Sequence, residues 1–384
     1  MIEKVNRGYK IRIYPNKEQA IQINKTLGCV RLIWNVSLNE RISVYENNKD
    51  KPEIYKAHKY KLQKDWKEEY PFMSEVDSQA LNTTQQELKS AFRNFYKGTH
   101  NFPIFKSKKH KRNSYTTHTT NNNVRIEDNY IRLPKIGLVK LKRKRRGLPI
   151  GAIIKAATVS LTITGKHYVS LRLEYIQDIP KLNETVTKAI GLDFSLKSFY
   201  VDSEGMKANY PMFLQLSSMK LSKLQRKLSK KQKDSYSYNA LKLRIAKFHE
   251  KIANQRKDYH HKQSRYLVDN YDLISVETLD LEEMMKNKYF SKKIHDIGYY
   301  TFISMLEYKC HDRGKVFKKV DKYYASSKIC SECGNKKKTL PLSQRTYTCE
   351  CGNVMDRDFN AALNICMEGI KAFFLKEEWT TSLA

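Results

Sequence analysis

Hydrophobic and polar positions alternate with changing periods along the chain, and these periods predict its elements. Residues 9–13 alternate between apolar and polar side chains, which predicts a short strand ending at Pro15. Asn16 and Gln19 then have the spacing of a capping box, and helical periodicity follows. We therefore expect a helical module over residues 16–98. Its apolar positions include Ile23, Leu27, Val30 and Trp34, with a second face at Ala80, Leu88, Phe92 and Phe95.

The segment that follows, to about residue 185, has the pattern of short strands. Its aromatic and hydroxyl residues are interleaved with basic ones, and Gly165-Lys166 marks a hairpin turn. Several such strands predict a small barrel with basic faces. Six of the seven residues from Lys140 to Arg146 are basic. This run can contact nucleic acid, or it can be a solvated loop.

From Ala189 the pattern changes to a mixture of buried strands and long helices. AIGLDF, LISVE and the segment from Val316 read as strands, and FNAALNICMEGI reads as a closing helix. Residues 214–270 read as a basic helical pair. Its apolar stripes are Leu221, Leu224 and Leu228 on one helix and Leu241, Ile245, Phe248 and Ile252 on the other.

The charge of the chain indicates its kind of partner. The 384 residues carry 72 lysines and arginines against 40 acids, a formal net charge of +32. A polyanion such as nucleic acid neutralises such a charge; a generally basic protein or an anionic membrane surface is the alternative. We find no apolar run of 18 residues and no signal peptide, so we expect no membrane partner and a cytoplasmic location.

Three carboxylates stand out by their context. Asp193 interrupts the apolar run AIGLDF, Glu277 ends the run LISVE, and Asp358 lies just before the closing helix. A carboxylate in a core strand is costly unless it is paired or binds a cation. Converging carboxylates suit magnesium, and two such ions can hydrolyse a phosphodiester. Taken singly, Asp193 can be an edge residue, Glu277 a turn cap and Asp358 a helix cap, with Asp356 as its rival.

The cysteines predict a structural metal site. CSEC and CEC form two pairs, each followed by a glycine that lets the backbone fold beneath a metal. Four thiolates bind zinc tetrahedrally in closed, structural sites. The second pair has a gap of one residue, which is tighter than usual. The expected zinc ligands are Cys330, Cys333, Cys349 and Cys351, while Cys29, Cys310 and Cys366 are expected in the core.

The ordered set of motifs resembles the TnpB family of bacterial insertion sequences, which are relatives of the type V CRISPR effectors. The motifs near the N-terminus and in the centre are YKIRIYPNKEQ and FPIFKSKK. They are followed by GLDFSLKSFYVDSEG, HEKIANQRKDYHHKQSRYLV, ISVETLDLEEMMKN, CSECG, CECG and DRDFNAALNI. The resemblance covers the chain to about residue 370. Its departure from the family pattern is the short CEC.

The resemblance implies an α+β multidomain fold. A wedge-type β-barrel carries a helical recognition insertion, and an RNase H-like RuvC domain with an inserted zinc ribbon follows. The implied segments are 1–15 and 99–185 for the barrel, 16–98 for the recognition module, 186–325 and 353–370 for the RuvC domain, 326–352 for the ribbon, and 371–384 for a C-terminal tail.

The implied activity is RNA-guided, magnesium-dependent cleavage of DNA beside a short transposon-adjacent motif. The family's catalytic acids correspond to Asp193, Glu277 and Asp358, which would hold two magnesium ions, and its zinc ligands correspond to the four clustered cysteines. The implied partners are a guide RNA from the transposon end and double-stranded target DNA, bound by a monomer. Tyr9, Phe102, Phe105 and Tyr115 can stack on bases or fill the core.

Other classes fit the chain less well. A DDE transposase has its acids in the order Asp, Asp, Glu, whereas the order here is Asp, Glu, Asp. A single-strand transposase of the HUH type needs two histidines flanking an apolar residue, but His260 and His261 are adjacent. The remaining alternatives are a nuclease-inactive RNA-guided repressor, which loses catalytic acids, and a compact type V CRISPR effector.

Overall fold

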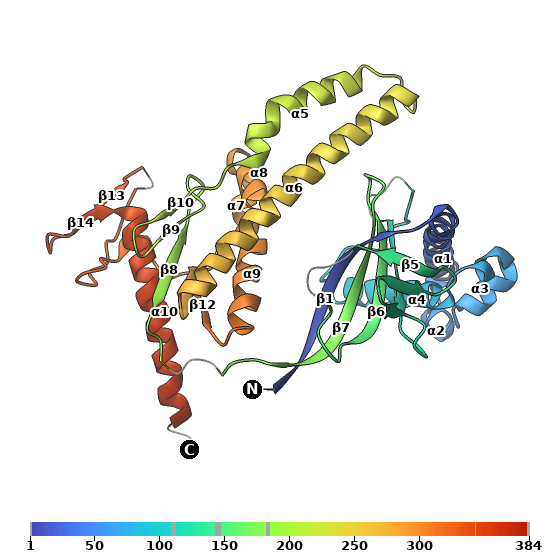
Figure 1. The fold of residues 1–384 in the computed structure, drawn as a ribbon, viewed down its shortest axis with the longest axis horizontal. Coiled ribbons are helices and arrows are strands. Elements are labelled where there is room, and N and C mark those ends of the chain that lie inside the picture. Colours follow the sequence, from blue (N-terminus) through green and yellow to red (C-terminus); the bar gives the residue numbers. More distant parts are fainter. Residues whose placement is uncertain (1, 109–112, 143–146, 182–184, 342, 382–384) are drawn as a thin grey trace. The chain divides into compact units, whose positions relative to one another are not determined.

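The computed structural model describes residues 2–108, 113–142, 147–181, 185–341 and 343–381. The chain divides into two compact units, an N-terminal unit of residues Ile2–Gln177 and a C-terminal unit that begins at Asp178 (Figure 1). This division lies shortly before the boundary expected after residue 185. Within the basic run that begins at Lys140, residues 143–146 lie outside the described residues.

The N-terminal unit combines helices with a seven-stranded sheet of order β2-β6-β7-β1-β5-β4-β3. The order has β2 and β3 as its two edge strands. Closure of the sheet into a barrel, which would require these edges to pair, stays a prediction. The elements of the unit are β1 (Ile2–Tyr14), α1 (Lys17–Asn48), α2 (Pro52–Ala57), α3 (Gln63–Glu69), a 3₁₀ turn (Pro71–Glu75), α4 (Ser78–Tyr96), β2 (Asn113–His118), β3 (Arg125–Glu127), β4 (Tyr130–Leu133), β5 (Gly137–Leu141), β6 (Ile153–Leu161) and β7 (His167–Asp178).

The capping box at the start of α1 is confirmed. The Asn16 side chain accepts a hydrogen bond from the Gln19 N–H at 2.8 Å, and the Gln19 side chain accepts one from the Asn16 N–H at 3.0 Å. Strand β1 begins earlier than its apolar alternation predicts. It lies between β7 and β5 in the sheet, and its described register with β5 involves only Ile13 and Tyr14, at its end. The predicted apolar positions of α1 and α4 are buried, except that Phe95 is half-buried.

The four aromatic residues considered for base stacking divide into two groups. Tyr115 is buried in the core of the N-terminal unit, and Tyr9 packs against that core. Phe102 and Phe105 are 44% and 48% exposed, so their rings are partly available to a ligand. Core packing therefore accounts for Tyr115 and Tyr9 but not for the exposed faces of the two phenylalanines.

The C-terminal unit contains a five-stranded sheet of order β10-β9-β8-β11-β12. Strand β11 runs parallel to β8 and β12, whereas β9 and β10 continue the sheet in antiparallel fashion. The elements of the unit are β8 (Ala189–Phe194), β9 (Tyr200–Asp202), β10 (Lys207–Ala208), α5 (Phe213–Ser229), α6 (Tyr236–Asn270), β11 (Leu273–Glu277), α7 (Leu281–Lys286), α8 (Lys288–Ile297), α9 (Tyr299–His311), β12 (Val316–Val320), a 3₁₀ turn (Ser326–Lys328), β13 (Thr346–Thr348), β14 (Val354–Asp356) and α10 (Arg357–Thr381).

Alternating residues of β8 face opposite sides of this sheet. Ile190 and Leu192 join a core with residues of α6 and α9, whereas Gly191 lies beneath α10 on the other face (Figure 1). A Cβ at Gly191 would overlap the backbone of α10, and a Cβ at Gly369 would overlap the Ser275 side chain on β11. These two glycines allow α10 to lie unusually close to the strands.

The two long helices α5 and α6 form the predicted hairpin (Figure 1). Their apolar stripes meet in a small separate core, which confirms the predicted pairing. The core is formed by Leu221, Leu224 and Ile245, with Leu214, Leu228, Leu241 and Phe248 packed against it.

Helix α10 continues past residue 371, where a separate tail was expected. Phe373 is buried with Leu273 of β11 and Val316 of β12, and this packing extends the helix along the sheet. Among the described residues, no helix combines the length and the hydropathy that crossing a membrane requires.

Candidate active site and metal centre

Asp193 and Glu277 lie at the carboxyl ends of neighbouring parallel strands. The register pairs Leu192 with Val276, so each acid directly follows a paired residue. Because Leu192 and Val276 face the α6–α9 core, strand alternation turns both acids toward the face that α10 covers. Glu277 Oε1 also accepts a hydrogen bond from the Phe194 N–H at 2.9 Å, which fixes its carboxylate beside β8.

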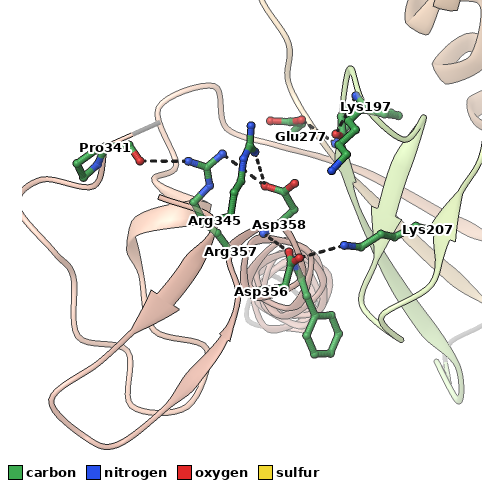
Figure 2. A network of polar contacts seen from close by, with 11 residues as sticks. Lys197, Lys207, Glu277, Pro341, Arg345, Asp356, Arg357 and Asp358 are labelled. Carbon is green, nitrogen blue, oxygen red and sulfur yellow. Dashed lines mark hydrogen bonds and ion pairs between the residues drawn. The ribbon is translucent and has the colours of Figure 1, made fainter. Parts of the chain in front are cut away.

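Asp358 reaches this face from the first turn of α10, and it is not the cap of that helix. Asp356 Oδ1 accepts hydrogen bonds from the backbone N–H groups of Asp358 at 2.9 Å and Phe359 at 3.2 Å. Asp356 therefore occupies the N-cap role that we had considered for Asp358. The Asp358 carboxylate does not cap the helix and lies near two arginine side chains instead (Figure 2).

Two arginines that the sequence interpretation missed balance the charge of Asp358. Arg345 Nη1 lies 3.6 Å and Arg357 Nη2 lies 3.5 Å from Asp358 Oδ1 (Figure 2). The Arg345 side chain is 66% exposed and that of Arg357 is 12% exposed. Arg357 lies inside the motif DRDF, so its place next to Asp358 in the sequence could have indicated a role at the site. No motif surrounds Arg345 in the ribbon, so the sequence did not indicate that it approaches Asp358.

The acids perturb one another electrostatically. Burial raises the pKa of Asp193 well above its ordinary value, and the charges of Glu277 and Asp358 add to that shift. Burial, together with the charge of Asp358, raises the pKa of Glu277 to about 7, although the Phe194 N–H opposes the shift. Mutual repulsion of this kind is relieved when a cation binds between the carboxylates.

The donor set fits a hard divalent cation. Asp193, Glu277 and Asp358 offer carboxylate oxygens, which magnesium prefers. In the described parts of the chain, the cysteine cluster is the one group of three or more potential ligands whose atoms all lie within 4.8 Å of one another. The three acids thus lie on the same face of the sheet and affect one another electrostatically. Their oxygen atoms are not as close together as the ligands of a single ion would be.

Tyr299 is a further residue of this site that the sequence interpretation missed. Its hydroxyl donates a hydrogen bond to the Ser195 carbonyl oxygen at 2.7 Å, and its ring packs on Phe194 at a centroid distance of 4.8 Å. Burial raises the pKa of Tyr299, and the charges of Glu277 and Asp193 raise it further. A neutral tyrosine therefore fixes the end of β8 immediately after Asp193.

The four clustered cysteines are arranged to bind one metal ion. Their sulfur atoms all lie within 4.8 Å of one another, with Cys330–Cys351 at 3.7 Å and Cys333–Cys349 at 3.6 Å. Tetrahedral zinc with Zn–S bonds of about 2.3 Å requires sulfur atoms roughly 3.8 Å apart. The one-residue gap between Cys349 and Cys351 does not prevent both thiols from reaching the cluster. Cys29, Cys310 and Cys366 are buried in the cores, as expected.

The ribbon around this cluster is fastened to α10. Asn360 donates a hydrogen bond to the Ile329 carbonyl oxygen at 2.7 Å and accepts one from the Ser331 N–H at 3.0 Å. Asn364 donates to the carbonyl oxygens of Ser326 at 2.8 Å and Ile329 at 2.7 Å. Both asparagines are buried on the helix that carries Asp358, so the first cysteine turn is bound directly to that helix.

Three family profiles match successive parts of the chain. A profile described as "Probable transposase", for OrfB of IS605, covers residues 170–288, and one described as "Cas12f1-like, TNB domain" covers residues 299–365. A third, described as "Helix-turn-helix domain", covers residues 1–50. The described part of that last segment forms strand β1 and one continuous helix, α1.

Similar proteins extend the match to nearly the whole chain. The "Putative RNA-guided DNA endonuclease" of Streptomyces pristinaespiralis is 33% identical over 374 residues, 97% of this chain and 91% of that protein. The "Putative RNA-guided DNA endonuclease InsQ" of Escherichia coli (strain K12) is 27% identical and covers 94% of this chain and 92% of that protein.

A solved structure shows the same fold. Cas12f1, in its complex with sgRNA and target DNA, superposes with a TM-score of 0.55 at 14% identity, over 94% of this chain and 99% of that chain. The fold is thus α+β with a four-cysteine cluster. From the near full-length similarity to the Streptomyces protein and the OrfB profile, the chain belongs to the TnpB (OrfB of IS605) family.

Proposed function

We propose that the chain is an RNA-guided, magnesium-dependent DNA endonuclease encoded by a transposon, which cuts beside a short transposon-adjacent motif. The observation that carries this proposal is the convergence of Asp193, Glu277 and Asp358 on the face of the sheet that α10 covers. Support comes from the family, from relatives whose names state RNA-guided DNA endonuclease activity, and from the net charge of +32.

In this proposal residues 186–325 and 353–370 form the RuvC-type nuclease domain, and residues 326–352 form its zinc ribbon. Residues 1–15 and 99–185 form the wedge-type barrel, and residues 16–98 form the recognition module. The guide RNA supplies sequence specificity by base pairing, while the protein reads duplex shape, backbone and the short motif. The chain acts as a monomer on double-stranded DNA, with a guide RNA from the transposon end.

Each residue of the site has a distinct task in cleavage. Glu277 is oriented by the Phe194 N–H, and Asp193 faces it from the adjacent strand. Arg345 and Arg357 hold Asp358 and place positive charge where a phosphate group would lie. Two bound magnesium ions would supply an activated water and stabilise the leaving oxygen.

Replacement of Asp193 by alanine tests this function. Loss of one carboxylate that holds a metal is expected to reduce cleavage by at least about a thousandfold, because such metal contacts contribute several kcal/mol to the transition state. Co-purifying RNA should be retained. Asp258→Ala removes an exposed carboxylate of α6 and serves as the control with normal cleavage.

The alternatives give different results in the same assay. A wild-type protein that binds its RNA and target but does not cut is a nuclease-inactive repressor. Full cleavage by Asp193→Ala contradicts the proposed site. A guide RNA transcribed from a CRISPR array rather than from the transposon end identifies a compact type V effector.

A further inference from the structure

Lys207 lies in the same row of the sheet as Asp193. Strand β9 pairs Val201 with Asp193 on one side and with Lys207 on the other. Residues paired across neighbouring strands project from the same face of a sheet. Lys207 therefore projects from the face that carries Asp193 and that α10 covers.

The two oxygens of Asp356 join this row to α10. Asp356 Oδ2 lies 3.0 Å from Lys207 Nζ, and Asp356 Oδ1 accepts the backbone N–H groups of Asp358 and Phe359 (Figure 2). One carboxylate thus binds the sheet with one oxygen and begins the helix with the other. The row from Asp193 through Val201 and Lys207 ends at the backbone of Asp358.

Asp356 is also the last residue of the hairpin of β13 and β14, which begins in the ribbon. It pairs with Thr346 of β13, and the next residue, Arg357, donates its N–H to the Arg345 carbonyl oxygen at 2.8 Å. Sheet, ribbon and helix therefore meet at Asp356, within two residues of the third acid.

We propose that Asp356 is a positioning residue for DNA cleavage, which sets the place of Asp358 relative to Asp193 without itself holding the catalytic cation. This inference rests on the proposed nuclease function. Its physical basis is that a displacement of about 1 Å in a catalytic group can cost a hundredfold in rate. Asp358 does not belong to a strand, and the cap binds the backbone N–H of this residue directly.

The two interactions of Asp356 differ in expected strength. The side chains of Lys207 and Asp356 are 50% and 42% exposed, and an ion pair of this kind contributes little. The helix cap matters more, and asparagine caps a helix about as well as aspartate. Asp356→Asn keeps the cap and loses the ion pair, whereas Asp356→Ala loses both.

The test measures cleavage of a guided target against magnesium concentration for wild type, Asp356→Asn, Asp356→Ala and Lys207→Met. We expect Asp356→Ala to lose about ten- to a hundredfold at limiting magnesium, with a raised magnesium midpoint and partial recovery at saturation. Asp356→Asn and Lys207→Met should each lose less than about fivefold, and their double variant should lose no more than either alone.

The controls separate positioning from ligation and from misfolding. Asp358→Asn marks the loss expected of a true ligand. Ser235→Ala removes the cap of α6, and it should leave the magnesium midpoint unchanged. Melting temperature and co-purified RNA report whether each variant folds. If Asp356→Ala does not fold, Asp356→Gly takes its place, because glycine also removes both side-chain interactions but destabilises a helix N-cap far less than alanine does.

Two results overturn the inference while wild type cuts normally. If Asp356→Asn cuts as poorly as Asp358→Asn, Asp356 is a ligand of the cation. If Asp356→Ala has the same magnesium midpoint as wild type, Asp356 has no positioning role. Failure of wild type to cut with its own RNA instead contradicts the proposed function and is recognised separately.

Discussion

At the scale of single residues, the three acids have unequal surroundings. Asp358 is accompanied by two guanidinium groups, whereas Asp193 and Glu277 have each other as near neighbours in a half-buried position. The raised pKa values of Asp193 and Glu277 follow from burial and from repulsion between the acids. Without a cation, burial and repulsion both disfavour the charged form of this pair.

This arrangement predicts a pH-dependent stability in the absence of magnesium. The pKa of Glu277 is about 7 in the folded chain against an ordinary value of 4.5. Between these values the folded state binds more protons than the unfolded state, so stability falls as pH rises toward and through 7. Glu277→Gln removes this loss, and its melting temperature relative to wild type should increase from pH 5 to pH 8.

The expected gain is about 2–4 °C for each kcal/mol of repulsion that is relieved. Magnesium should raise the melting temperature of wild type at pH 8 but not that of Glu277→Gln. Glu282→Gln changes an exposed glutamate of α7 and should follow wild type throughout. If the difference in melting temperature between Glu277→Gln and wild type does not change with pH, the pKa of Glu277 is not raised by burial and by Asp358.

At the scale of elements, the cysteine ribbon explains why a structural metal site lies next to carboxylates. Its hairpin runs into the cap of α10, its first turn is fastened by Asn360 and Asn364, and its loop supplies Arg345. A ribbon this small has little core of its own, so we expect it to need a metal at the four cysteines in order to fold. Such a metal would support the position of Asp358.

Removal of the metal should affect cleavage more than RNA binding. Cys330→Ser with Cys333→Ser should reduce zinc from one ion per chain to almost none, because the remaining thiols form half a site. Structural zinc contributes an apparent 10–16 kcal/mol in isolated zinc-finger peptides, about enough to unfold the ribbon when the ion is removed. Cleavage should fall at least about tenfold.

Elemental analysis, a cleavage assay and recovery of co-purified RNA check this prediction together. Cys29→Ala, in the core of the other unit, should keep its zinc and its activity. A ribbon variant that lacks zinc but cuts at the wild-type rate excludes a role for the ribbon in placing Asp358.

The end of the α5–α6 hairpin is expected to bind the phosphate backbone of nucleic acid. A groove of about 780 Å³ there is lined by Lys227, Lys230, Lys231 and Arg244 beside the 92% exposed Tyr236. Substitution of the four basic residues by glutamine should weaken the salt dependence of RNA binding. The slope of the logarithm of the binding constant against the logarithm of the salt concentration should fall in magnitude by about 0.7–0.9 for each phosphate group that is no longer neutralised.

The matched control changes four exposed lysines of the N-terminal unit, Lys49, Lys51, Lys56 and Lys59, to glutamine. Binding isotherms over a range of salt concentrations separate the two sets. An equal loss in both sets shows that the binding depends on total charge rather than on the hairpin groove.

Local patterns in the sequence predicted most elements because local interactions determine them. The capping box at Asn16, the turn at Gly165 and the paired stripes of α5 and α6 are examples. The ion pair of Lys207 with Asp356 and the approach of Arg345 to Asp358 were not predictable in this way. The ion pair depends on how closely α10 packs on the sheet, which Gly191 and Gly369 allow from distant positions. The approach of Arg345 depends on the pairing of β13 with β14, which brings Arg345 next to Arg357.

At the scale of the whole molecule, a strongly basic chain carries the acidic site formed by Asp193, Glu277 and Asp358. The net charge of +32 favours a polyanionic partner. The three acids would repel such a partner unless cations lie between the acids and the polyanion. A nucleic-acid enzyme that uses divalent metal satisfies both conditions. The family to which the chain belongs is consistent with this combination.

The most direct measurement of RNA guidance is a change of guide. The protein is expressed with its flanking DNA, its co-purified RNA is sequenced, and the variable end of that RNA is replaced. RNA guidance predicts a single structured RNA and magnesium-dependent cleavage that moves to the newly matched target beside the same short motif. Heterogeneous cellular RNA, or a cut site that stays where it was, would contradict RNA guidance.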